Sequence, residues 1–147
     1  MLRILLVSCV VVLIDAKVVE VKGKLMCGDK PAKGVTVKLV DEDFASGDDT
    51  LAKMDTGDDG KFHLKGDEDD LDPHVKIYHK CGEEGLMSWI KCDRKWEFIV
   101  PDKYVYKGTV VKKVFDFGIM NLEMKLEDED RDCIHRRRKH HRHHQHH

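Results

Sequence analysis

The last thirteen residues hold the side chains whose types are best suited to chemistry. Residues 135–147 contain seven of the ten histidines and five arginines or lysines, with no acidic residue. Arginine and lysine attract phosphate and sulfate groups, and neutral imidazole binds zinc or copper. This tail is therefore predicted either to bind anionic surfaces or to bind metal weakly. A tail that is only solvated is the remaining interpretation, since nothing apolar follows Ile134 that could fold. The anionic-surface residues are Arg136, Arg137, Arg138, Lys139 and Arg142, and the metal candidates are His140, His141, His143, His144, His146 and His147.

Three histidines lie in the body of the chain. His79 could serve as a general base or a metal ligand, but no serine, cysteine or carboxylate partner stands at a fixed spacing from it. A structural role at a strand end is therefore favoured. His63 and His74 alternate with apolar residues and are predicted to face solvent.

Two acidic stretches resemble cation sites only in part. DTGDDG (55–60) places aspartates as a calcium loop would, but Gly57 and Gly66 occupy the positions where ligands belong. We predict a tight hairpin turn there. The cluster GDEDDLD (66–72) could hold calcium weakly, and a solvated loop is the favoured interpretation.

A short apolar stretch interrupts the polar second half of the chain. It either packs back on the domain or forms a contact loop for a partner or a lipid surface, where tryptophan is favoured. Its residues are Leu86, Met87, Trp89 and Ile90.

The N-terminus predicts export. Residues 1–16 have a positive charge at Arg3, a short apolar run and a small residue at Ala16, which is typical of a signal peptide. The remaining Cys27, Cys81, Cys92 and Cys133 then predict two disulfides, because no close thiolate spacing suits zinc. Residues 17–134 suit one domain, followed by the tail at 135–147. The domain carries 20 Lys and Arg against 27 Asp and Glu, a net charge of −7.

Alternating apolar and polar residues predict an all-β domain. Six segments show period-2 alternation, and Gly- and Asp-rich turns separate them. With two weaker segments, the count reaches about seven to eight antiparallel strands, which predicts a β-sandwich. The six segments are 19–27, 35–39, 61–65, 74–78, 95–100 and 120–126, and the two weaker ones are 50–54 and 110–118.

Six ordered motifs resemble the nematode transthyretin-like family over residues 18–135. They are GKLMCGDKPAKGVTVKLVDED, DTGDDGKFHLKG, VKIYHKC, RKWEFIVPDKYV, FDFGIMNLEMKL and RDCIH. The resemblance implies a disulfide-stabilised, prealbumin-type sandwich of two four-stranded sheets, secreted to the extracellular space. It also suggests the disulfide pairs Cys81–Cys92 and Cys27–Cys133.

Transthyretin has enzymatic relatives, the 5-hydroxyisourate hydrolases, which raises the question of catalysis. Aligned on the KPAKGV turn, Lys22 stands where these enzymes have a histidine, and their C-terminal Tyr-Arg-Gly-Ser motif is missing. Lysine does not shuttle protons near neutral pH without a large pKa shift. A hydrolase is therefore disfavoured.

The sequence thus predicts a secreted, non-catalytic binding protein of the extracellular space. Its partner would be an extracellular protein or an anionic surface such as phospholipid or sulfated glycan. The alternative is a carrier of a small apolar ligand or of Zn/Cu. We expect no cofactor, no nucleic-acid partner and no transmembrane segment.

Overall fold

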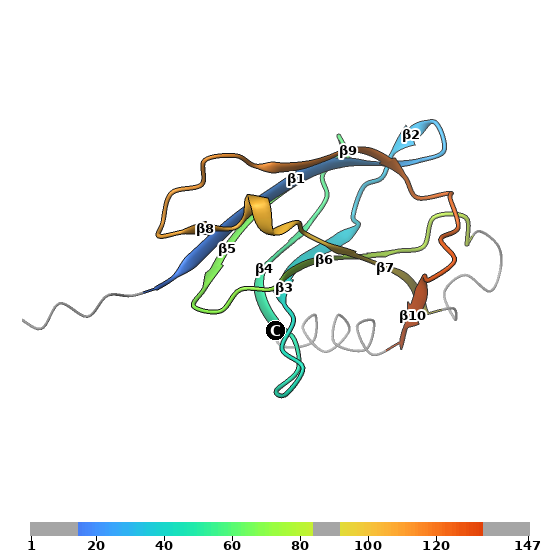
Figure 1. The fold of residues 1–147 in the computed structure, drawn as a ribbon. Helices are drawn as coiled ribbons and strands as arrows, with labels where there is room; N and C mark the ends of the chain where they lie inside the picture. The colour runs from blue at the N-terminus through green and yellow to red at the C-terminus, as the bar shows by residue number, and fades with distance from the viewer. Residues whose placement is uncertain (1–14, 84–91, 134–147) are drawn as a thin grey trace, which may run out of the picture.

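Two five-stranded sheets form a β-sandwich in the computed structural model, which describes residues 15–83 and 92–133 (Figure 1). The predicted all-β sandwich is therefore confirmed, although each sheet has one strand more than the resemblance implies, because very short strands extend both. None of the helical segments in the described ranges is long and apolar enough to cross a membrane.

Sheet A is built around β1 (Lys17–Cys27). Strand β5 (Lys61–Glu68) runs antiparallel along one side of β1, and β9 (Phe115–Asn121) runs parallel to it. The two-residue strands β2 (Lys30–Pro31) and β8 (Tyr106–Lys107) pair with the two ends of β1.

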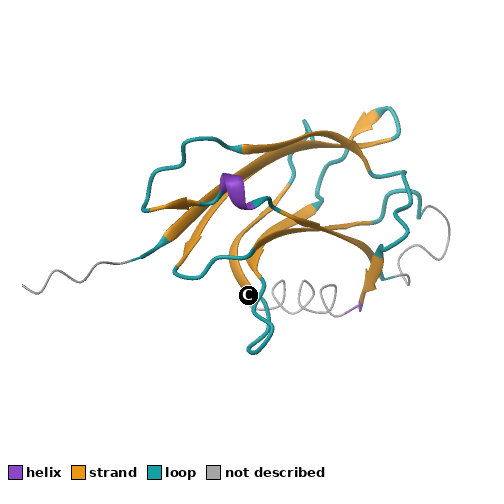
Figure 2. Cartoon of the chain, viewed as in Figure 1, coloured by secondary structure: helices purple, strands orange, loops and turns teal. Residues whose placement is uncertain are grey.

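Sheet B has the strand order β10-β7-β6-β3-β4, and all its neighbours are antiparallel. The central strand β6 (Pro73–His79) is buried along its whole length, although its alternation predicts burial on one face only. The other strands are β3 (Thr36–Asp41), β4 (Asp49–Asp55), β7 (Asp93–Ile99) and β10 (Asp130–Asp132), and a 3-10 turn, η1 (Asp102–Tyr104), follows β7 (Figure 2).

The core lies between the sheets and consists of the inward members of the alternating segments. These side chains leave water almost completely, which supplies the main driving force for folding. Fully buried examples are Val19, Val21, Leu25, Phe62, Val37, Leu39, Val75, Ile77 and Trp96.

The predicted hairpin at 55–60 is wrong in its topology. Strand β4 pairs with β3 in sheet B, whereas β5 pairs with β1 in sheet A, so this turn crosses between the sheets. Gly60 has a φ of +70°, and a Cβ on it would lie 2.3 Å from the carbonyl oxygen of Leu25. The turn therefore requires glycine both for its backbone conformation and for its close approach to β1.

The strand predicted at 120–126 is also misplaced. Strand β9 ends at Asn121, and the chain then turns and enters sheet B as β10, which pairs with β7. The alternation beyond Asn121 reflects one buried residue, Leu122, in a turn rather than a continued strand.

The disulfide pairing suggested by the resemblance is wrong as well, because the structure joins Cys27 to Cys81 and Cys92 to Cys133. Cys27 ends β1 and Cys81 follows β6, so this bond links the two sheets, with Cα atoms 5.7 Å apart. Asp132 on β10 faces Asp93 on β7, and this register brings the next pair together, with Cα atoms 4.6 Å apart. The suggested pairs would have required the last strand to lie beside the first.

Candidate functional site

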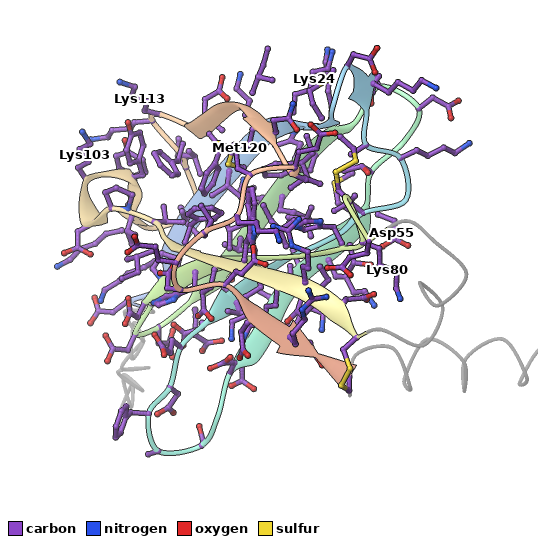
Figure 3. The ribbon with its side chains drawn as sticks, turned by 90° about the vertical axis from the view of Figure 1, so that its right-hand side faces the viewer. Lys24, Asp55, Lys80, Lys103, Lys113 and Met120 are labelled. Atoms are coloured by element: carbon purple, nitrogen blue, oxygen red, sulfur yellow. A yellow bond between two sulfur atoms is a disulfide. The ribbon has the colours of Figure 1, made fainter. Side chains whose placement is uncertain are left out.

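A groove on the outer face of sheet A combines lysine side chains with an apolar lining. Val21 and Leu25 on β1 point into the core, so Lys22 and Lys24 point outward. Their partners on β5 are His63 and Lys61, which also face solvent. Figure 3 shows Lys24 on the outer side of sheet A, directed away from sheet B.

The groove has a volume of about 700 Å³ and lies over β1, β5 and β9. We call it the lysine groove. Its apolar lining includes Met54 from β4 and Ile119 from β9, and the Ile119 side chain is one of the most exposed apolar groups in the described chain. The complete lining is Lys22, Gly23, Lys24, Met54, Gly57, Asp59, Lys61, Phe62, His63, Asp116, Gly118 and Ile119.

Some charges of the lysine groove are already paired. The Lys22 ammonium lies 4.0 Å from the Asp116 carboxylate, and both side chains are about half exposed. His63 contacts the carboxylate of Glu20 through its Nε2. Asp59 accepts a hydrogen bond of 3.0 Å from the backbone N–H of Lys61.

Two lysines of the groove are not paired. The ammonium groups of Lys24 and Lys61 form no ion pair or hydrogen bond with any residue in the described ranges. These residues are direct cross-strand partners, so two like charges stand side by side. An anion placed between them would relieve their repulsion, while an apolar body attached to it could cover Met54 and Ile119. The lining contains no serine, threonine or cysteine, so the groove offers no hydroxyl or thiol nucleophile.

His79 has the structural role that its sequence context favours. It is 4% exposed, its Nδ1 accepts a hydrogen bond from the N–H of Cys81 at 3.1 Å, and its ring packs against Trp96 with centroids 5.2 Å apart. Burial, helped by the positive charge of Arg94, lowers the pKa of His79 to about 4. The ring is therefore neutral at physiological pH and buried in the protein.

The sequence analysis missed a buried polar network that is centred on Arg94. Arg94 on β7 is 2% exposed and donates hydrogen bonds to three backbone carbonyls and to the carboxylate of Glu129. Trp96 donates a further bond of 3.0 Å to Glu129. Chiefly because of the hydrogen bond from Arg94, the pKa of Glu129 falls to about 2. The signal was present, since alternation puts Arg94 on the same inward face as Trp96.

His74 is not on a solvent face, which corrects the prediction for this residue. It is 6% exposed and lies among three carboxylates, those of Glu42, Asp72 and Glu97. The segments that follow β3 and precede β6 cover it. Sequence alternation could not reveal this environment, because Glu42 is 32 positions and Glu97 is 23 positions from His74 in the chain.

The acidic stretch at 66–72 also has more structure than a solvated loop. Its carboxylates line a concavity of about 480 Å³ together with those that follow β3. Eight of the ten residues that line this concavity are aspartate or glutamate.

Several predicted site residues lie outside the described residues. These are the apolar contact loop Leu86, Met87, Trp89 and Ile90, and the whole tail from 135 to 147. The predictions for them stay predictions.

The fold defines the class of protein: a disulfide-bonded β-sandwich of transthyretin type. Sequence comparison agrees, because residues 22–101 match the model of the transthyretin-like family. The chain belongs to this family.

Three relatives from Caenorhabditis elegans cover most of the chain. Transthyretin-like protein 5 is 40% identical over 78% of this chain and 83% of its own length. Transthyretin-like protein 33 is 41% identical over 79% of this chain and 81% of its own length. Transthyretin-like protein 46 is 39% identical over 82% of this chain and 68% of its own length.

Proposed function

We propose that the chain is a secreted, non-catalytic binding protein that engages anionic ligands or surfaces through the lysine groove and the basic tail. The observation that carries this proposal is the pair Lys24 and Lys61, which stand side by side and form no ion pair with any of the described residues. Uncompensated like charges on an otherwise acidic domain favour an anionic ligand.

Secretion is supported by the two disulfides, because such bonds persist in oxidising compartments. The signal-peptide pattern of residues 1–16 points the same way. A non-catalytic role is supported by a groove without a hydroxyl or thiol nucleophile. We therefore expect that the pure protein does not hydrolyse 5-hydroxyisourate above the spontaneous rate.

The tail would add to the affinity of the groove for a surface. Five arginines and lysines each contribute about 1 kcal/mol at most beside an anionic membrane. Histidines with an ordinary pKa near 6.5 gain protons as the pH falls from 7.5 to 5.5. Surface binding should therefore strengthen over this range and weaken with added salt.

The carrier function is the second candidate, and the apolar lining of the groove favours it. A small amphipathic anion could place its acidic group between Lys24 and Lys61 and its apolar body over Met54 and Ile119. In this case the groove alone would suffice, and loss of the tail would leave ligand affinity unchanged.

The test measures binding to vesicles that contain an anionic phospholipid, to heparin and to a fluorescent fatty acid. Four proteins are compared: the full chain, a chain ending at His135, the groove variant Lys24→Gln/Lys61→Gln, and the charge-matched control Lys112→Gln/Lys125→Gln, whose lysines lie outside the groove.

The groove variant should lose up to roughly 30-fold in affinity, about 1 kcal/mol per lysine, and the control much less. Equal affinities for the groove variant and the control would refute a role for the groove. Equal affinities for the full and shortened chains, or no pH dependence, would refute a role for the tail.

A further inference from the structure

We propose that Glu42, Asp72 and His74 form a Zn²⁺ site at the edge of sheet B, independent of the lysine groove and of the tail. One Nε2 nitrogen and one oxygen from each carboxylate lie within 4.8 Å of one another. The Nε2 of His74 is 2.8 Å from Glu42 Oε2 and 3.7 Å from Asp72 Oδ1. A single ion could therefore contact all three side chains after small rotations of the two carboxylates.

The backbone fixes the residues that carry these ligands. Glu42 directly follows β3, and its N–H donates a hydrogen bond of 3.0 Å to the carbonyl oxygen of Asp72. Asp72 donates its own N–H to the buried carboxylate of Asp41 at 2.6 Å. His74 lies on β6, opposite Val40 of β3. The site is thus held by two paired strands and their ends, rather than by one exposed loop.

The second nitrogen of His74 has the partner that a metal-binding histidine needs. Nδ1 lies 3.0 Å from Glu97 Oε1 on β7, and a carboxylate in this place takes the Nδ1–H. In the tautomer that keeps its proton on Nδ1, the Nε2 lone pair points toward Glu42 and Asp72. A zinc ion would then take the place of the proton through which Nε2 would otherwise bond to these carboxylates.

Burial adds a second argument. The His74 side chain is only 7% exposed, whereas those of Glu42 and Asp72 are 43% and 63% exposed. The imidazole is therefore held in place at the base of the site, while the two carboxylates remain open to solvent and can close on an ion. The neighbouring acidic concavity, which Glu42 and Asp72 also line, would concentrate cations at this edge.

The donor set selects the class of metal. Calcium and magnesium take oxygen ligands almost exclusively, whereas zinc readily takes imidazole nitrogen together with carboxylate oxygen. Three protein ligands leave a position for water, which is an open zinc site. Glu97 would act as the supporting partner outside the coordination sphere.

The seven tail histidines would also bind zinc, so the test removes them within the full-length chain. In this parent protein His135, His140, His141, His143, His144, His146 and His147 are replaced by glutamine. Calorimetric titration with Zn²⁺ alone should show one equivalent of binding. The substitution His74→Gln should remove it or weaken it at least 100-fold, and the matched control His63→Gln, an exposed histidine of sheet A, should leave it unchanged.

Glu42→Gln and Asp72→Asn keep the test decisive if His74→Gln does not fold, because both side chains are largely exposed. Each should weaken Zn²⁺ binding at least 10-fold, and Glu97→Gln should weaken it 10- to 100-fold without a change in stoichiometry. The proposal is overturned if the parent binds no zinc, or if Glu42→Gln and Asp72→Asn bind as the parent does. Zn²⁺ binding that survives His74→Gln unchanged would equally refute a zinc site built on imidazole.

Discussion

The two sheets differ in their basic side chains, because among the described residues only sheet B buries any of them almost completely. On sheet A, Lys22 is exposed, Lys61 is exposed, and Lys24 is half-buried at the side of an open groove. On sheet B, four basic residues are almost fully buried, and each of the four lies beside an acidic or aromatic side chain. They are His74, Lys76, His79 and Arg94.

This contrast separates charges that support the fold from charges that are available to a ligand. A buried charge must keep its partners, since removal of one partner leaves the other desolvated and unpaired. An exposed charge contributes little to stability and can exchange its water for a ligand. His74 is the exception on sheet B, because its neighbours Glu42 and Asp72 remain open to solvent.

The largest effect is expected at Arg94. Arg94→Met would leave Glu129 without its guanidinium partner and three backbone carbonyls without a donor. We expect the free energy of unfolding to fall by about 3–5 kcal/mol, measured by urea denaturation at pH 7. Lys33→Met removes an exposed cation whose partner, Asp58, is also exposed, and should cost much less. Similar losses for the two variants would contradict the contrast between buried and exposed charges.

The next effect depends on pH and concerns His79. Its folded-state pKa of about 4 lies below the ordinary 6.5, so the unfolded chain binds a proton that the folded chain rejects. The contribution of the neutral His79 ring to the free energy of unfolding is fully present above pH 6.5 and is lost as the pH falls toward 4. Between pH 7 and 4.5 we expect a loss of about 2–3 kcal/mol that disappears in His79→Gln.

The control for this pH dependence is His63→Gln, which should retain the full loss because His63 is exposed. Titration of Glu129 changes the stability little above pH 4.5. Its pKa is lowered to about 2, so its contribution to stability is lost mainly below that pH. Identical pH profiles for His79→Gln and the parent protein would show that the buried ring does not carry the effect.

Lys76 should have an intermediate effect. It contacts Asp48 and lies 3.5 Å from Glu97. Burial alone would lower the pKa of Lys76, but the hydrogen bond to Asp48 and the charge of Glu97 outweigh it and raise the pKa. Lys76→Met should cost about 1–3 kcal/mol at pH 7, less than Arg94→Met, because water can reach both carboxylates. A loss as large as that of Arg94→Met would show that partial exposure of the partners does not moderate the cost.

The sequence was sufficient for the sandwich but not for the partners of its charges. Period-2 alternation located the inward faces of β1, β3, β5 and β7, but the predicted strand at 95–100 began one residue too late to include Arg94. Alternation could not show that the chain crosses from β9 to β10 in the other sheet, because that choice depends on contacts between distant segments. The error in the disulfide pairing follows from the same missing crossover.

The lysine groove and the proposed zinc site also differ in how far the sequence alone predicts them. Lys22 and Lys24 could be assigned to an outer face from the burial of their neighbours, so their exposure follows from local sequence. The surroundings of His74 require β3, β6 and β7 to be placed side by side in the correct register. Residues at 42, 72 and 97 then meet at one imidazole, and no local pattern contains that information.

The smallest effect is expected in the lysine groove. Lys24 and Lys61 are direct cross-strand partners of like charge, and such pairs are mildly destabilising. Lys24→Gln/Lys61→Gln should therefore change the free energy of unfolding by no more than about 0.5 kcal/mol, in the stabilising direction and more so at low salt. Urea denaturation at 20 mM and 500 mM salt measures both the sign and the screening. The same variant is expected to lose affinity for anionic vesicles, so stability and binding should change in opposite directions. A destabilisation of 1.5 kcal/mol or more would mean that these lysines hold sheet A together, and the two sheets would then not differ in how they use charge.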